Sequence, residues 1–177
     1  MSTIKGLSLW QPWAVVMETG AKRNETRSWP TKHRGPLAIQ ASKKRPTDIV
    51  GLLGILRDDW AAWAPALRDA GCPIDEHRRV IGLGGLAYGA IACVVNVVDC
   101  VSITAENAPS WPERAFGDYT PGRFMFVTDR VVRLAEPVPF RGAQGMFDVP
   151  VDLLGDAVER LGCRPAEASS LFQGARQ

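Results

Sequence analysis

Histidine and zinc-type cysteine patterns are scarce in this chain. It has only two histidines, His33 and His77. Its four cysteines form no CxxC pair; they are Cys72, Cys93, Cys100 and Cys163. Zinc sites are usually built from closely spaced cysteine and histidine ligands, so this composition argues against a metal centre. We expect buried free thiols, no metal ion and no cofactor.

Long apolar runs are also absent. The most apolar stretch, residues 91–101, contains Asn96 and Asp99, whereas a membrane-spanning helix needs about 18 consecutive apolar residues. The first residues lead directly into a strand-like run, without the pattern of a secretory leader. The sequence therefore predicts a soluble, cytoplasmic protein with no membrane partner, and it leaves the oligomeric state open.

Acidic residues are scarce in one segment of the chain. From residue 20 to residue 45 the only acid is Glu25, against eight bases: Lys22, Arg23, Arg27, Lys32, Arg34, Lys43, Lys44 and Arg45. This segment carries a net charge of +7, and because the whole chain carries +2, the remainder carries −5. A basic surface on a slightly acidic body is typical of proteins that contact phosphate, although a solvated run of charge is the simpler explanation.

The remaining composition is that of one folded domain. The chain has 177 residues, of which 46% are hydrophobic and 23% charged, values at which a protein can bury a core without disulfides. Short strands, few helices and no βαβ alternation predict an α+β fold, a mixed β-barrel of about five to six strands with flanking helices. We place this domain at residues 1–150, with a helical insertion at about 58–85, and a C-terminal helix and tail at 151–177.

Periodicity and turn residues predict the individual elements. We expect strands at 5–10, 24–29, 36–41 and 89–101, a strand or hairpin at 123–134, and a loop with a short last strand at 142–149. We expect helices at 13–18, 48–56, 60–67 and 151–161. Residues 107–122 are rich in proline and glycine and predict a structured loop. The segment 137–139 is not expected in a central strand, because its two prolines cannot donate to a ladder.

Three clusters of side chains could carry chemistry. In the strand at 24–29 the two-residue period places Glu25, Arg27 and Trp29 on one face, with Lys22 at its mouth; the simpler alternative is an exposed ion pair. Trp10 and Trp13 flank a Gln11-Pro12 turn and could stack on bases, or pack in the core. The loop 116–123 carries three further candidates, unless it is only a turn: Asp118, Tyr119 and Arg123.

These residues resemble the ASCH domain family. The resemblance rests on the run from Leu7 to Ala14, on the GxKxxExR spacing of residues 20–27 followed by Trp29, and on His33-Arg34-Gly35 and residues 38–42. It extends more weakly through Asp99 and the 117–123 loop to Val149, and it leaves out residues 58–85 and the C-terminal helix. The resemblance implies a PUA-like barrel whose cleft, lined by the GxKxxExR residues, is a proposed RNA-binding surface.

Relatives of this family differ in activity. The resemblance extends to the C-terminal domain of a transcriptional coactivator associated with DNA binding, and to small bacterial proteins. Some of those hydrolyse N4-acetylcytidine with a Lys-Thr-Glu set, and others are described as ribonucleases. Lys22 matches the lysine of that set, but Glu25 occupies the position of the threonine, and Thr26 beside it should face the other way. Glu113 or Asp118 could stand near the position of the glutamate.

Two functions follow as hypotheses. The first is a module that binds RNA, single-stranded DNA or a nucleoside or nucleotide. Its phosphate contacts would come from Lys22, Arg27, Arg34, Lys43 and Lys44, its stacking from Trp10, Trp13 or Trp29, and its base-edge contacts from Gln11 and Glu25. The second is a hydrolase acting on nucleosides or RNA, with Lys22 and Glu25 as the acid–base pair and Asp118, Tyr119 or Arg123 completing the site. A protein-interaction adaptor is a third, weaker alternative.

Overall fold

A computed structural model describes residues 2–44, 58–72 and 85–162. Within them, six strands form one mixed sheet in the order β2-β5-β4-β3-β1-β6. The strands are β1 (Thr3–Leu9), β2 (Asn24–Arg27), β3 (Gly35–Ala41), β4 (Ala90–Ser102), β5 (Phe124–Pro139) and β6 (Met146–Pro150). The helices are α1 (Trp13–Glu18), α3 (Trp60–Asp69) and α4 (Ala157–Arg160), with 3-10 turns η1 (Glu113–Phe116) and η2 (Val151–Leu154).

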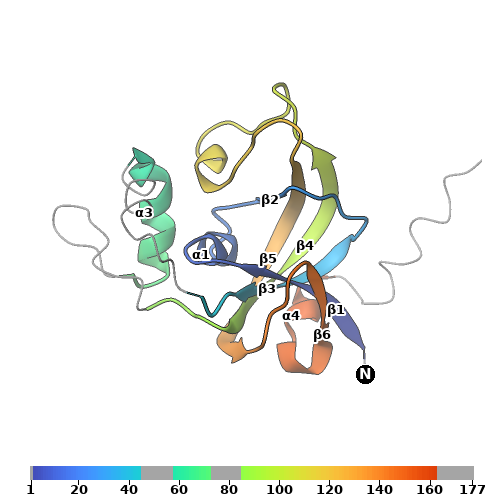
Figure 1. Cartoon of the computed structure of the whole chain (residues 1–177). Coiled ribbons are helices and arrows are strands. Elements are labelled where there is room, and N and C mark those ends of the chain that lie inside the picture. Colours follow the sequence, from blue (N-terminus) through green and yellow to red (C-terminus); the bar gives the residue numbers. More distant parts are fainter. Residues whose placement is uncertain (1, 45–57, 73–84, 163–177) are drawn as a thin grey trace, which may run out of the picture.

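The α+β class is confirmed, but the expected barrel is not what the sheet forms. In the described part of the chain, β2 pairs only with β5 and β6 pairs only with β1, so the two outer strands do not meet. β1 runs parallel to β3, and the other paired strands are antiparallel. The sheet is therefore open, with the edges at β2 and β6 (Figure 1).

Helices cover both faces of this sheet. Leu37 and Ile39 of β3 pack with Ala14 and Met17 of α1. Ala38, which alternation turns to the other face, packs with α4. On the first side α3 adds a second layer, because the fully buried Trp63 contacts α1 and η1 (Figure 1). These two layers bring η1 and the end of α1 to the place where β2 begins.

Several element predictions need correction. The single helix expected at 151–161 is two short pieces, η2 and α4, separated by Gly155 at φ 56°. The strand predicted at 123–134 extends to Pro139, and its last part, 137–139, pairs with β4 through Val138 and Pro139 but, as expected, not in a central position. β2 reaches only residues 124–127 of β5, so these prolines lie where β5 has a neighbour on one side alone. The helix expected at 48–56 lies outside the described residues.

Candidate functional site

A glycine turn delivers Lys22 to the start of β2. Gly20 follows α1 with φ 75°, a conformation that side-chain-bearing residues rarely adopt. The backbone N–H of Lys22 then donates to the carbonyl of Val16 at 2.8 Å, which folds the chain back over the helix. The Lys22 side chain consequently points into the protein, where its ammonium donates to the carbonyl of Phe116 at 2.9 Å.

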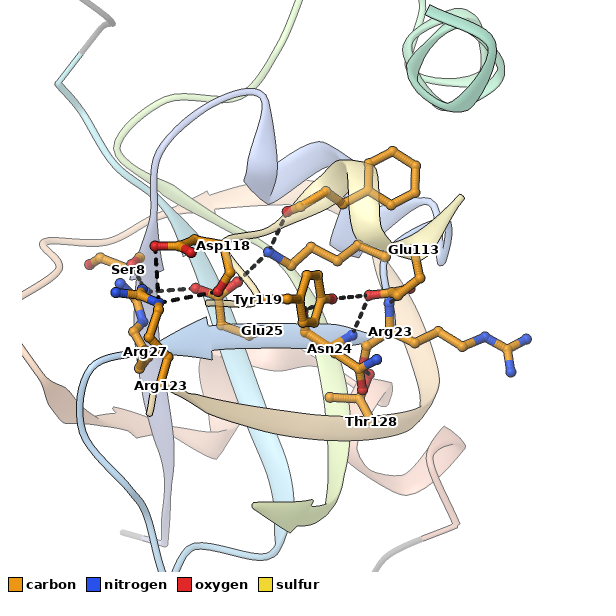
Figure 2. Close-up of polar contacts among 12 residues, drawn as sticks. Ser8, Arg23, Asn24, Glu25, Arg27, Glu113, Asp118, Tyr119, Arg123 and Thr128 are labelled. Atoms are coloured by element: carbon orange, nitrogen blue, oxygen red, sulfur yellow. Dashed lines mark hydrogen bonds and ion pairs between the residues drawn. The ribbon is translucent and has the colours of Figure 1, made fainter. Parts of the chain in front are cut away.

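Glu25 lies between two cations. One carboxylate oxygen is 2.7 Å from Nζ of Lys22, and the other is 3.1 Å from a guanidinium nitrogen of Arg27. The Lys22 and Glu25 side chains are only 2% and 5% exposed, whereas Arg27 is 27% exposed. Arg27 also donates to the carbonyl of Ser8 at 2.8 Å, as Figure 2 shows. This network joins β2, β1 and η1, and it carries a net positive charge.

A second carboxylate fixes the loop that follows. Glu113 accepts hydrogen bonds from the backbone N–H groups of Arg23 and Asn24, both at 2.9 Å, and from the hydroxyl of Tyr119 at 2.8 Å (Figure 2). Burial, reinforced by the charge of Glu113, raises the pKa of the Tyr119 hydroxyl, which therefore stays protonated and donates. Glu113 is thus occupied in holding η1 and its loop against β2, and this clamp also positions the Phe116 carbonyl for Lys22.

Above this network lies a cavity of about 560 Å³, here named the Lys22 cavity. Its walls come from β1, α1, β2 and the η1 loop. Its charged lining consists of two bases and two acids: Lys22, Arg27, Glu25 and Asp118. Hydrogen bonds from Thr120 lower the pKa of the Asp118 carboxyl, which also lies 3.2 Å from Arg123. The lining is therefore charge-balanced, with both donors and acceptors beside two aromatic walls, Trp10 and Trp13.

A larger cavity of about 960 Å³ adjoins the first, here named the Gly142 cavity. It shares Ser8, Trp10 and Arg27 with the Lys22 cavity. Its other walls include Gln40, Lys43, Trp29 and the residues 139–145. Trp10 stands at the shared rim, 48% exposed, with the ammonium of Lys44 5.1 Å from its ring centroid. Trp29 packs against Phe126 of β5, with the ring centroids 5.3 Å apart.

Five of the predicted site residues line neither cavity: Gln11, Arg34, Lys44, Tyr119 and Arg123. Gln11 is fully buried, donating to the carbonyl of Ala87 at 2.9 Å and accepting from the Val15 amide. Arg34 lies 2.6 Å from Asp99. Tyr119 is held by Glu113, and Arg123 by Asp118. These side chains already have partners within the protein.

Sequence reasoning also missed residues that the structure brings to the cavities. The 139–145 segment lines the larger cavity, and its signal in the sequence was the pair of glycines that flank Ala143-Gln144, directly after Phe140-Arg141. Gln40 gave no signal, because a glutamine inside an apolar strand resembles any other buried polar residue. The roles of Glu113 and of the Phe116 carbonyl depend on a contact between segments about 90 residues apart.

The described residues also limit other site types. In ranges 2–44, 58–72 and 85–162, no group of three or more histidine, cysteine or acidic side chains is arranged to hold a metal ion. None of the helices in these ranges has the length and apolarity to cross a membrane. Cys72 and Cys93 are buried free thiols, whereas Cys163 lies outside the described ranges.

Comparison with known proteins adds a family match. The model of the ASCH domain matches residues 7–128, a range that contains the end of β1 together with α1, β2 and η1, and thus the lining of the Lys22 cavity. Activating signal cointegrator 1 of Mus musculus is 56% identical to this chain over 41 residues, and that of Homo sapiens is 54% identical over 41 residues. Each alignment covers 23% of this chain and only 7% of the relative.

Proposed function

Because this chain belongs to the ASCH domain family, with its PUA-like fold, we propose that it binds single-stranded nucleic acid, RNA or DNA. One unpaired base would enter the Lys22 cavity. The observation that carries this proposal is the buried Lys22–Glu25–Arg27 network beneath a cavity whose rim holds the exposed Trp10. The association of the family with RNA binding supports it further.

The chemistry of the cavity suits a base. A base edge presents hydrogen-bond donors beside acceptors, and it carries no charge. Glu25 can accept from an amino or imino group, while Lys22 and Arg27 can donate to a ring nitrogen or carbonyl. The two basic and two acidic side chains of the lining balance in charge. An uncharged nucleobase can therefore enter the cavity without facing a net charge. Trp10 offers an aromatic face, and stacking of one base on such a face contributes about 1–3 kcal/mol.

The test is binding of fluorescently labelled single strands of about 12 nucleotides, a length within the range of known single-strand sites. Anisotropy would be measured between about 50 and 200 mM salt, and the same samples would be checked for cleavage. Affinity should fall with salt, and Arg27→Gln should weaken binding more than Arg160→Gln, which removes an equal charge from an exposed side chain of α4. The same affinity for both variants, or no affinity in the wild type, would count against the proposal.

A second candidate is hydrolysis of a nucleoside or RNA bond. Its support is the Lys22–Glu25 pair, 2.7 Å apart at the wall of a cavity, which could move a proton between substrate and water. Thr26 is also among the lining residues, although Glu25 holds the position that family resemblance gives to a nucleophile. Lys22→Met should abolish product formation while strand binding persists. Unchanged turnover in this variant, with its fold checked by urea unfolding, would exclude the second candidate.

A further inference from the structure

The two cavities differ sharply in charge. Acids and bases balance in the lining of the Lys22 cavity, but the charged side chains lining the Gly142 cavity are all basic: Arg27, Lys43 and Arg141. No acidic residue is among the described residues that line it. Three cations around one hollow favour an anion, and guanidinium groups bind phosphate well through paired N–H donors. The larger cavity therefore suits a different part of the ligand from the smaller one.

The cavities meet along a short shared wall. Ser8, Trp10 and Arg27 line both, so a ligand leaving the Lys22 cavity passes directly into the Gly142 cavity. Arg27 is held on one side by Glu25 and by the carbonyl of Ser8. This arrangement fixes the Arg27 guanidinium at the junction, between a carboxylate in the smaller cavity and the cations of the larger one.

The wall of the Gly142 cavity is anchored on the sheet. Gln40 of β3 is buried, accepts from the hydroxyl of Ser8 at 2.7 Å and donates to the carbonyl of Phe140 at 3.2 Å. The backbone of Gly142 packs so closely on this pair that an added Cβ would overlap the Ser8 hydroxyl and the Gln40 carbonyl oxygen. Only glycine permits this approach, and it places Arg141 and the residues after it at the cavity wall.

From these observations we propose that the Gly142 cavity binds the phosphodiester next to the base held in the Lys22 cavity. The ligand is then a strand and not a free nucleoside: the base occupies the neutral cavity, and the adjoining phosphate lies among Arg27, Lys43 and Arg141. Trp10, at the rim that the two cavities share, stacks with a base that lies between them. This inference rests on the proposed function, and it names the ligand class for that function.

The test compares two charge-matched double variants. Lys43→Gln/Arg141→Gln removes two cations from the Gly142 cavity, and Arg68→Gln/Arg160→Gln removes two exposed cations that line neither cavity. For single strands, each neutralised phosphate contributes about 0.7 to the steepness of log affinity against log salt, so loss of this one phosphate contact should reduce the steepness by up to about 0.7. The affinity of the first variant at low salt should fall at least about tenfold, as expected when charge-assisted hydrogen bonds to a phosphate are removed, and the second variant should stay near the wild type.

A neutral backbone gives an independent measurement. A strand with one phosphodiester replaced by a methylphosphonate should bind the wild type more weakly when the neutral linkage lies beside the recognised base. The same replacement should have a smaller effect on Lys43→Gln/Arg141→Gln, because two of the three cations that contact this phosphate are already gone. Gly142→Ala should also weaken strand binding without changing any charge, by displacing the 140–145 wall.

The outcomes separate this inference from the function on which it rests. If no strand binds the wild type, both fail. If strands bind, but Lys43→Gln/Arg141→Gln keeps the affinity and salt slope of the wild type, only the phosphate site is wrong. Equal losses in the two double variants would also overturn it, because they would show a general charge effect. A free nucleoside that binds as tightly as the strand would overturn the assignment of ligand class.

Discussion

At the scale of single residues, the position of Glu25 between Lys22 and Arg27 makes its charge structurally necessary. Removing one partner from a buried ion pair costs about 3–5 kcal/mol, because the other charge is left without compensation. Glu25→Gln leaves two cations without a carboxylate, whereas Lys22→Met leaves Glu25 still paired with Arg27. We expect Glu25→Gln to lower the free energy of unfolding by about 3–5 kcal/mol and Lys22→Met to lower it less.

Urea unfolding of both variants and of the double variant measures this ranking. In the Glu25→Gln background, Lys22→Met should recover part of the lost stability, because it removes one of two unbalanced cations. Equal losses in the single variants, or losses that simply add in the double variant, would show that the three groups do not act as one network.

Protonation of His33 should make the stability of the folded protein depend on pH. Burial lowers the pKa of His33, and the nearby charges of Lys5 and Arg34 lower it further. In the unfolded chain this imidazole takes up a proton near its ordinary pKa of about 6.5, whereas the folded protein resists protonation until a lower pH. The unfolded state therefore binds more protons in this window, and stability should fall as the pH drops from about 6.5 towards 5.

His33→Gln isolates this contribution, since its amide can still donate to the Pro36 carbonyl, which lies 3.0 Å from the ring Nε2. The stability of the wild type relative to the variant, measured by urea unfolding, should decrease as the pH falls below about 6.5. Parallel curves for the two proteins over the same range would contradict the assignment of the pH dependence to His33.

The sequence pattern predicted that Lys22, Glu25 and Arg27 lie together, but it did not predict which of the polar candidate side chains are buried. The two-residue period correctly placed Glu25 beside Arg27, because both belong to one short strand. Gln11 and Tyr119 have the same side-chain chemistry as many binding residues, yet both are buried on partners inside the protein. Those partners, Ala87 and Glu113, come from other segments, and a local pattern contains no information about them.

At the scale of elements, Glu113 ties the η1 turn to the first residues of β2. Its two carboxylate oxygens accept from the Arg23 and Asn24 amides and from Tyr119. Glu113→Gln keeps only one acceptor oxygen, so one of these amides should lose its partner. Hydrogen exchange at Arg23 and Asn24 should then become faster, because local opening needs less free energy when such a bond is lost.

Glu106→Gln is the matched control, because Glu106 is an exposed glutamate in the preceding loop. It should leave exchange at both amides unchanged. The same variant pair tests the consequence for the cavity, since η1 also presents the Phe116 carbonyl to Lys22. Wild-type exchange rates in Glu113→Gln would show that the clamp contributes little to the order of this loop.

Element predictions succeeded where a pattern was regular and failed where a strand changed register. The helix predicted at 13–18 agrees with α1, whose residues 14–17 are all buried in the two layers that pack around it. Cys93 and Cys100 are seven residues apart, a spacing that would place them on opposite faces of a regular strand, yet both pack on the same core cluster. Register shifts in β4 between Asn96 and Asp99 change the alternation, and such bulges depend on pairing with β5.

At the scale of the whole molecule, closure of the sheet was the property that the sequence could not supply. Strand number and class follow from local patterns, but a barrel requires hydrogen bonds between the first and last strands of the sheet order. β2 has only four residues, all paired with β5, and β6 pairs with β1 at the other end. The sheet therefore stays open at β2 and at β6. Both cavities are lined by segments that are distant in sequence.

Ligand binding should therefore stabilise the molecule as a unit. The walls of the Lys22 cavity come from β1, α1, β2 and the η1 loop, which assemble only in the folded chain. A strand at a hundredfold excess over its dissociation constant stabilises a folded protein that alone binds it by about 2.7 kcal/mol. For a chain of this size that gain corresponds to a rise in Tm of about 5–11 °C.

Thermal unfolding of the wild type with increasing oligonucleotide measures this shift, and Lys43→Gln/Arg141→Gln at the same strand concentration should show a smaller one. A strand that binds by anisotropy but leaves the Tm unchanged would place binding outside the folded cavities. A shift that grows with the logarithm of strand concentration, and that shrinks as salt is raised, would instead link the folded sheet, its two cavities and a phosphate-bearing ligand in one equilibrium.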